Sequence, residues 1–290
     1  MNVVTHNSRF HADDVSSCYI LSKLFPEAKV VRTRDEKIIN AGHIVVDVGG
    51  IYDHDLNRYD HHQEEFDETF SDKHFVPLSS VGLIYRHYGK EYIKKMLNEW
   101  TTDEEVKKSV DLDYVYMALY NSIILETDAL DNGILSYPED TSLKYHVTTN
   151  LSNVVACMND VNTFSEKQEH KFHMAMSYVG TVYQIKLESL FEKSIAYKKF
   201  KPIVDEAMSK RMDIHESGSI VVLPEECPVW WTYVMEFEHA SKEKVQIMYV
   251  IHPSKDTWKI CTLSKNFVPR KKLLSKSELS EKIEEEKFVF

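Results

Sequence analysis

Short apolar runs and a helical pattern alternate over the first 50 residues of the chain. The apolar runs that predict buried strands lie at residues 3–5, 29–33 and 44–48. Between the first two runs, residues 14–25 carry apolar side chains at helical spacing and stop before Pro26. The third run is stopped by Gly49 and Gly50. Strand, helix, strand and strand in this order predict a parallel α/β sheet.

Beyond residue 50 the pattern is mainly helical until the last third of the chain. A polar loop is predicted at 53–69, followed by helical patterns at 79–88, 91–100, 103–125 and 164–212. Pro202 is expected to interrupt the last of these helical patterns. After Gly218 the pattern predicts strands at 220–223, 245–251 and 258–262, with a short helix at 230–237. The mixed charges of 276–287 predict a solvated helix.

The predicted fold class is therefore α/β in three parts. A parallel-sheet N-terminal lobe (1–163) is followed by a helical connector (164–212) and a smaller α/β C-terminal lobe (213–290). The length of 290 residues fits more than one average domain, and 43% hydrophobic with 28% charged residues is ordinary for a globular chain. No apolar run is long enough for a membrane helix, and no leader precedes His6. A cytoplasmic or nuclear location, without a signal or transit peptide, is the expectation.

The net charge and the spacing of the cysteines argue against two kinds of function, binding of long duplex DNA and a cysteine-based zinc site. The formal net charge is −11, from 35 basic and 46 acidic residues. Such a chain is not expected to bind long duplex DNA through a broad basic surface, whereas a short oligonucleotide or a small phosphoester needs only a local site. The four cysteines are far apart and form no CxxC pair, so buried reduced thiols are expected and a cysteine zinc site is not.

Imidazoles and carboxylates gather where the predicted strands end. Six of the 14 histidines fall within the first 62 residues. His6 ends the first strand, His11 and Asp13 follow before the first helix, and Asp47 ends another strand. Open α/β sheets bind ligands beyond the carboxyl ends of their strands. Mixed imidazole and carboxylate ligands suit Mn, Zn, Fe or Co, and crowded carboxylates favour a bound cation. The sequence therefore predicts a metal site at this edge.

Five motifs occur in a fixed order: THNSRFHADD, VVDVGG, RYDHHQ, LSSVGLIY and ETDALDNG. In this order they resemble the melanocyte-proliferating-gene-1 family, which belongs to the wider DHH phosphoesterases with the manganese-dependent pyrophosphatases and the RecJ-type exonucleases. A lone Asp-His-His would be a weak signal, but five ordered motifs are not. The resemblance implies a DHH-type catalytic lobe and a metal-dependent hydrolase.

The resemblance also implies a role for each matching residue. One divalent cation would be held by His6, His11 and Asp47, and a second by Asp13, Asp47, His61 and Asp128, with Asp47 bridging. His11 stands where the wider superfamily more often has an Asp, in agreement with the narrower family. Mn²⁺ is the first choice of metal, with Mg²⁺, Co²⁺ and Zn²⁺ behind it.

Two further residues of the DHH motif are predicted to serve catalysis. His62 would contact the substrate phosphate, as a donor or as general acid to the leaving oxygen. Asp60 would support the two histidines as a hydrogen-bond acceptor, the alternative being a simple loop cap.

Other residues carry weaker signals. Arg32, Arg34 and Arg58 could bind phosphate, because guanidinium matches it in a fork, or could pair with nearby acids. Asn7 could orient a ligand or cap a turn.

A predicted helix start and a pair of tryptophans each allow two interpretations. Ser79, Ser80 and Gly82 predict a helix start whose N–H groups could receive an anion or a plain cap. Trp230 and Trp231 could stack on bases, although core packing is the commoner use.

The leading functional hypothesis is a two-metal 3′–5′ exonuclease acting on RNA or short oligonucleotides. One alternative is a small-molecule phosphohydrolase of the pyrophosphatase kind, and another is a metal-binding protein with lost activity. The hypothesis of lost activity rests on the glycines. No glycine follows Gly218, so the glycine-rich substrate motif of DHH hydrolases is not expected here. Either truncation or natural loss would explain this. A homo-oligomer is left open.

Overall fold

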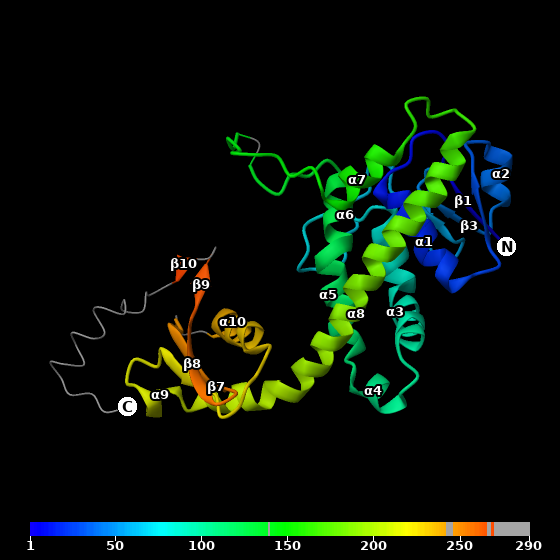
Figure 1. Cartoon of the computed structure of the whole chain (residues 1–290). Coiled ribbons are helices and arrows are strands. Elements are labelled where there is room, and N and C mark those ends of the chain that lie inside the picture. The colour runs from blue at the N-terminus through cyan, green and yellow to red at the C-terminus, as the bar shows by residue number, and fades with distance from the viewer. Residues whose placement is uncertain (139, 242–245, 266–267, 270–290) are drawn as a thin grey trace. The chain divides into compact units, whose positions relative to one another are not determined.

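The computed structural model describes residues 1–138, 140–241, 246–265 and 268–269 (Figure 1). These residues form two compact units, of which the first comprises Met1–Ser194 and the second begins at Ile195. The helix α8 (Lys167–Ser209) begins in the first unit and ends in the second. The division predicted at 1–163, 164–212 and 213–290 stays a prediction, and the helix predicted at 276–287 lies outside the described residues.

A mostly parallel sheet organises the first unit and confirms the predicted α/β class. Its strands are β1 (Asn2–Thr5), β2 (Lys29–Arg32), β3 (Ile44–Val46), β4 (Tyr52–Asp53) and β5 (Arg58–Tyr59). They lie in the order β2-β1-β3-β5-β4, and only β4 runs antiparallel to its neighbour. The polar loop predicted at 53–69 missed β4 and β5, because a strand of two residues has no periodicity to detect.

Helices cover the two faces of this sheet (Figure 1). The helices near the sheet are α1 (Ala12–Leu24), α2 (Glu36–Ala41) and α3 (Ser80–Trp100). On one face, Ile39 of α2 packs against Val4 and Val45, which are fully buried. Helix α1 contacts β1 and β3 and packs along α3. Helix α3 is continuous, so the two predicted patterns at 79–88 and 91–100 are one helix.

The helical stretch predicted at 103–125 is several helices. They are α4 (Glu104–Ser109), α5 (Leu112–Leu119), a π-helix η1 (Tyr120–Ile124) and α6 (Leu125–Asp131). The break before α5 has a local cause: the Asp111 carboxylate accepts hydrogen bonds from the backbone N–H groups of Asp113 and Tyr114, which starts a new helix. The elements α5, η1 and α6 then follow without interruption.

The later helices of the first unit pack on α1 and α3. A short helix α7 (Leu151–Met158) is capped by Asn150. In α8, Tyr183 lies against Tyr19 of α1, with ring centroids 5.8 Å apart, and Phe191 lies 5.3 Å from Trp100 of α3. The predicted interruption at Pro202 is wrong, because α8 continues through it. Pro202 removes one helical hydrogen bond, but burial of the apolar side chains of Val204 and Met208 in the following turns stabilises the helix and offsets this loss.

The second unit is a small α/β unit built on a three-stranded sheet. Its elements are α9 (Arg211–Ile214), β6 (Ile220–Val222), α10 (Trp230–Ala240), β7 (Tyr249–Ser254), β8 (Thr257–Thr262), β9 (Ser264–Lys265) and β10 (Val268–Pro269). Strand β7 pairs in parallel with β6 and antiparallel with β8. Val221, Val250 and Val234 belong to its core. Trp230 packs against this core, whereas Trp231 is 38% exposed.

Two remaining expectations concern the membrane and the thiols. No helix within the described residues is long and apolar enough to span a lipid bilayer. All four cysteines are free. Cys18 and Cys227 are buried as predicted, but Cys261 is partly exposed and Cys157 is exposed on the short α7.

Candidate metal centre

The carboxyl ends of three neighbouring parallel strands supply the centre of the site. His6 follows β1, Asp47 follows β3, and the Asp60-His61-His62 segment follows β5. Asp47 has a φ of 56°, in the left-handed region that non-glycine residues rarely adopt. The two glycines after it also have positive φ, so the chain turns sharply just beyond β3. The carboxylate of Asp47 is thereby turned toward the histidines, at a cost in backbone strain.

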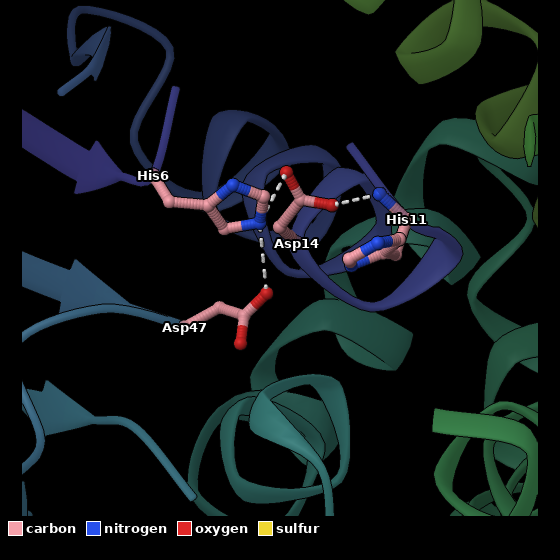
Figure 2. Close-up of side chains that lie close together, drawn as sticks. All are labelled: His6, His11, Asp14 and Asp47. Atoms are coloured by element: carbon pink, nitrogen blue, oxygen red, sulfur yellow. Dashed lines mark hydrogen bonds and ion pairs between the residues drawn. The ribbon is translucent and has the colours of Figure 1, made fainter. Parts of the chain in front are cut away.

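The first group of potential metal ligands comprises His6, His11, Asp14 and Asp47 (Figure 2). His6 Nε2 lies 3.2 Å from Asp47 Oδ2 and 3.5 Å from Asp14 Oδ2. The ring of His11 lies 5.7 Å from that of His6, measured between centroids. Asp14 also accepts a hydrogen bond from the backbone N–H of His11 at 2.7 Å, which fixes the start of α1. One ligand atom of each residue lies within 4.8 Å of the others.

Two further groups lie on the other side of Asp47. One consists of Asp47, His61 and His62, and the other of Asp13, His61 and Asp131. Asp47 Oδ1 is 3.7 Å from His61 Nε2, while its other oxygen, Oδ2, faces His6. Asp131 Oδ2 lies 3.0 Å from the same His61 atom. The two oxygens of Asp47 therefore face two separate ligand sets, as a bridging carboxylate would.

The N-terminus of α3 holds the buried carboxylate of Asp13. Asp13 accepts hydrogen bonds from the backbone N–H groups of Ser80 and Val81 and from the Ser79 hydroxyl. The predicted helix start at Ser79 and Ser80 is thus confirmed, and the anion that its N–H groups receive belongs to the protein itself. Asp13 is fully buried.

Asp128 is placed differently from the other predicted ligands. Its Oδ1 accepts a hydrogen bond from Ser79 N (3.0 Å) and lies 2.8 Å from Ser79 Oγ, whose single proton is shared with Asp13, and its Oδ2 accepts one from Tyr120 of the π-helix (3.0 Å). Among the described residues, Asp128 is in none of the three groups, whereas the other five predicted ligands are. Asp128 contacts the site through Ser79, which also binds Asp13.

Crowding of charges shifts the pKa values of the buried groups. Burial raises the pKa of Asp14 to about 7, with Asp47 adding to the shift and His6 opposing it. Burial, with the charges of Asp47 and Asp131, also raises the pKa of Asp13. For His6, burial alone would lower the pKa, but the hydrogen bond to Asp47 and the charge of Asp14 raise it to about 9. All three pKa shifts are upward, as expected where negative charges are crowded in a buried site.

Several potential ligand atoms of the site are buried without a hydrogen-bond partner among the described residues, and a cation would satisfy them. Within the described part of the chain, Asp14 Oδ2, Asp47 Oδ1 and His61 Nε2 are buried without a properly aligned hydrogen bond. Buried polar atoms are normally satisfied, because desolvation costs about 1–3 kcal/mol for each one left alone. Imidazole nitrogens and carboxylate oxygens that converge from several elements are the ligand set of a divalent transition metal. The residues therefore fit the metal that the sequence predicts.

His62 differs from the other histidines because its side chain is 62% exposed. Its Nδ1 lies 2.7 Å from Asp60 Oδ1, and Asp60 Oδ2 accepts a hydrogen bond from Gly50 N. Asp60 is buried, and the hydrogen bond to it raises the pKa of His62. Asp60 thus fixes the ring so that the second nitrogen, Nε2, is left for another partner.

The three arginines with predicted phosphate roles are placed apart from these groups. The Arg32 guanidinium lies over the rings of Phe10 and Phe172, at 5.5 and 4.5 Å from their centroids, and pairs with Glu169. Arg58 donates to backbone carbonyls of residues 40, 56 and 57, and Arg34 is exposed. Their phosphate roles stay predictions. The backbone oxygen of Asn7 accepts a hydrogen bond from His6 Nδ1 at 3.0 Å, which leaves His6 Nε2 for the site.

Two site residues, Asp14 and Asp131, were not singled out from the sequence. Asp14 is adjacent to Asp13 and three residues beyond His11, a spacing that predicts a capping box. Asp131 stands three residues after Asp128, so both lie on one side of α6. That spacing is a signal in the sequence, but it does not say which of the two carboxylates faces the site.

Comparisons with known proteins agree with the family resemblance that the five ordered sequence motifs indicate. The family model MYG1_exonuc, described as an uncharacterised protein family (UPF0160), matches residues 2–290. The chain is 33% identical over 274 residues to the MYG1 protein of Dictyostelium discoideum, which covers 92% of this chain and 79% of that protein. It is 34% identical over 266 residues to the MYG1 exonuclease of Homo sapiens (88% and 68%) and 35% identical over 258 residues to that of Mus musculus (86% and 65%). No solved structure shows a significant match.

Proposed function

The chain belongs to the MYG1 exonuclease family, and from that premise we propose that it is a two-metal phosphoester hydrolase of the DHH type that shortens RNA or short oligonucleotides from the 3′ end. The observation that carries the proposal is the position of Asp47. Its two oxygens face two sets of imidazoles and carboxylates, and Oδ1 is buried without a hydrogen-bond partner among the described residues.

The two ligand sets divide the residues between two cations. His6, His11 and Asp47 would hold one cation, with Asp14 beside them. Asp13, Asp47 and His61 would hold the other, because His61 shares one group with Asp47 and another with Asp13. Mn²⁺ is the first choice because both sets mix nitrogen and oxygen ligands. When bound, two such ions supply Lewis acidity that activates water and neutralises charge on phosphoryl oxygens.

Asp128 and Asp131 have separate roles in this proposal. The resemblance gives Asp128 to the second cation, but both of its oxygens accept hydrogen bonds from Ser79 and Tyr120. Asp131 Oδ2 lies 3.0 Å from His61 Nε2. We therefore assign the fourth contact of the second set to Asp131 and give Asp128 the role of holding Ser79 against Asp13.

His62 and Asp60 supply the proton chemistry. Asp60 accepts a hydrogen bond from His62 Nδ1, and this bond raises the pKa of the His62 ring. In the proposed step, water gives up a proton to solvent and forms a bond to phosphorus as the bond to the leaving oxygen breaks. His62 donates its Nε2 proton to that oxygen and takes a proton back from solvent. The exposure of His62 allows it to reach a substrate at the edge of the site.

A small phosphoester is the second candidate substrate. The net charge of −11 favours it, since long polyanions are repelled and a small one needs only the local cation site. Relatives named exonuclease favour the oligonucleotide. The two candidates differ in what they predict for a labelled RNA.

The first experiment is hydrolysis of a 5′-labelled single-stranded RNA with added Mn²⁺. The wild type is compared with Asp47→Asn, and with Asp55→Asn as a matched control on the exposed turn between β4 and β5. Stepwise shortening by the wild type and Asp55→Asn, but not by Asp47→Asn, is the expected result. Metal content of two ions per chain in Asp47→Asn would refute the site.

The other outcomes separate the alternatives. If the wild type binds two ions but leaves RNA intact, nucleoside and inorganic phosphoesters are assayed next, and turnover there would replace the exonuclease by a small-molecule phosphohydrolase. If those also stay intact while the ions bind, the protein is a metal-binding protein without activity. A 3′-labelled RNA that loses its label in the first step supports the proposed polarity.

A further inference from the structure

The segment between the first two predicted ligands is short and irregular. Residues 7–10 join His6, at the end of β1, to His11, at the start of α1. Ser8 in this segment has a φ of 70°, so the backbone is held in an uncommon conformation. Asn7 supplies the carbonyl that fixes the His6 ring. The spacing and orientation of the two imidazoles therefore depend on how this segment is held.

Asn159, just after α7, holds both backbone polar groups of Phe10. Its Oδ1 accepts a hydrogen bond from Phe10 N at 3.0 Å, and its Nδ2 donates to Phe10 O at 2.9 Å. One side-chain amide thus makes the pair of bonds that a neighbouring strand would make. Phe10 is fully buried, so no water replaces these bonds if they are lost.

Gln168 of α8 completes the arrangement from the other side. Its Nε2 donates to Ser8 O at 2.9 Å and to Asn159 Oδ1 at 2.6 Å, and its Oε1 accepts from Asp160 N at 2.9 Å. Gln168 is only 3% exposed. The same Ser8 carbonyl accepts a hydrogen bond from Arg32 at 2.8 Å. Every polar atom of the Gln168 side chain is therefore committed to the segment or to its support.

Aromatic packing removes the remaining freedom of the segment. The ring of Phe10 meets that of Phe172 edge to face, 5.6 Å apart, and Arg32 lies over both rings. The segment is held by side chains of β2, α8 and the end of α7, which are far from it in sequence. None of Asn159, Gln168 and Phe172 is among the predicted metal ligands.

We propose that Asn159 and Gln168 are positioning residues for the divalent cation held by His6 and His11. They act through the backbone of residues 7–10, which sets the distance between the two imidazoles and the carbonyl that orients His6. This inference rests on the proposed metal site. Groups that orient metal ligands through hydrogen bonds typically change metal affinity about 10- to 100-fold when removed.

The test compares Asn159→Leu with Asn153→Leu in calorimetric titrations with Mn²⁺. Leucine has nearly the shape of asparagine and removes both bonds to Phe10. Asn153 is an exposed residue of α7 whose side chain donates to Val147 O, so its replacement leaves residues 7–10 untouched. We expect Asn159→Leu to bind Mn²⁺ about 10- to 100-fold more weakly. The control is expected to match the wild type.

A second variant and a spectroscopic measurement distinguish a positioning role from a general loss of structure. Asn159→Asp keeps the acceptor for Phe10 N but turns an oxygen toward Phe10 O, so an intermediate affinity is expected. The visible absorption of bound Co²⁺ reports the geometry of its ligands and should change in Asn159→Leu while far-UV circular dichroism does not. If Asn159→Leu does not fold, Asn159→Asp and Gln168→Glu carry the same comparison.

The outcomes distinguish this inference from the proposed function. A folded Asn159→Leu or Asn159→Asp with wild-type Mn²⁺ affinity and a wild-type Co²⁺ spectrum overturns the positioning role alone. A wild type that binds none of Mn²⁺, Mg²⁺, Co²⁺ and Zn²⁺ overturns the metal site itself, and both proposals with it.

Discussion

Replacing Gly82 by alanine tests how tightly α3 is packed against Asp128. A Cβ atom on Gly82 would lie 2.5 and 2.6 Å from the two carboxylate oxygens of Asp128 and 2.7 Å from Leu78 Cδ2. Contacts this short do not occur between such atoms, so one partner must move. Asp128 cannot withdraw freely, because it is fully buried and bonded to Ser79 and Tyr120.

Two opposing effects decide the sign of the change in stability. Alanine in a helix interior is favoured over glycine by up to about 1 kcal/mol. Against this, displacing Asp128 disrupts one or two hydrogen bonds to a buried carboxylate, at about 1.5–3 kcal/mol each. We expect Gly82→Ala to lower the free energy of unfolding by about 2–4 kcal/mol, or the melting temperature by roughly 5–15 °C for a unit of this size.

The assay is urea unfolding followed by far-UV circular dichroism. Asn98→Ala, on an exposed position of the same helix, is the matched control and should stay within about 0.5 kcal/mol of the wild type. Because Ser79 joins Asp128 to Asp13, Gly82→Ala should also weaken Mn²⁺ binding. A variant as stable as the wild type, or more stable, would refute the reasoning.

Three other predictions follow from the same geometry. Mn²⁺ at 100 times its Kd should raise the free energy of unfolding of the wild type by about 2.7 kcal/mol, with no such gain in Asp47→Asn; an equal gain in both would place the ion elsewhere. His62→Gln should lower kcat about 10²- to 10⁴-fold while Mn²⁺ affinity stays unchanged, and a parallel loss of affinity would contradict its role as general acid. Burial and the neighbouring His54 lower the pKa of His87 to about 4 from 6.5. As the pH falls from 6.5 to about 4, the unfolded chain takes up this proton before the folded one, so the free energy of unfolding should fall, and fall less in His87→Gln. Equal pH dependence of the two proteins in urea unfolding would contradict this.

The part of the site that the sequence predicts best depends on strand order alone. Once residues 3–5 and 44–48 are recognised as parallel strands, His6 and Asp47 must meet at one edge of the sheet. No side-chain packing enters that argument. His61 is different, because it follows a strand too short to detect and is predicted only from the family motif.

The part that could not be predicted depends on partners far apart in sequence. Asp128 and Asp131 stand on one side of the same helix, and nothing local tells which carboxylate is free for a metal. Ser79 and Tyr120 donate hydrogen bonds to the two oxygens of Asp128, and on that ground we propose Asp131 rather than Asp128 as the ligand.

The surroundings of Arg32 are a similar case. Its guanidinium contacts Phe172 and Glu169 of α8, which lie far from it in sequence, and its phosphate role stays a prediction. A pattern read along the chain contains neither partner. The structure also shows why the helix predicted at 103–125 is broken, since Asp111 caps a new helix within it.

The π-helix η1 makes the site depend on a residue count as well as on residue types. A π turn holds more residues than an α turn, and successive residues of an α-helix are about 100° apart around the axis. If the same five residues, Tyr120–Ile124, formed an ordinary α-helix instead, everything after them would be rotated by about that angle. Asp128 and Asp131 would then face a neighbouring direction with every motif letter intact. In this chain, the phase of one helix therefore decides where the two carboxylates of the ETDALDNG motif point.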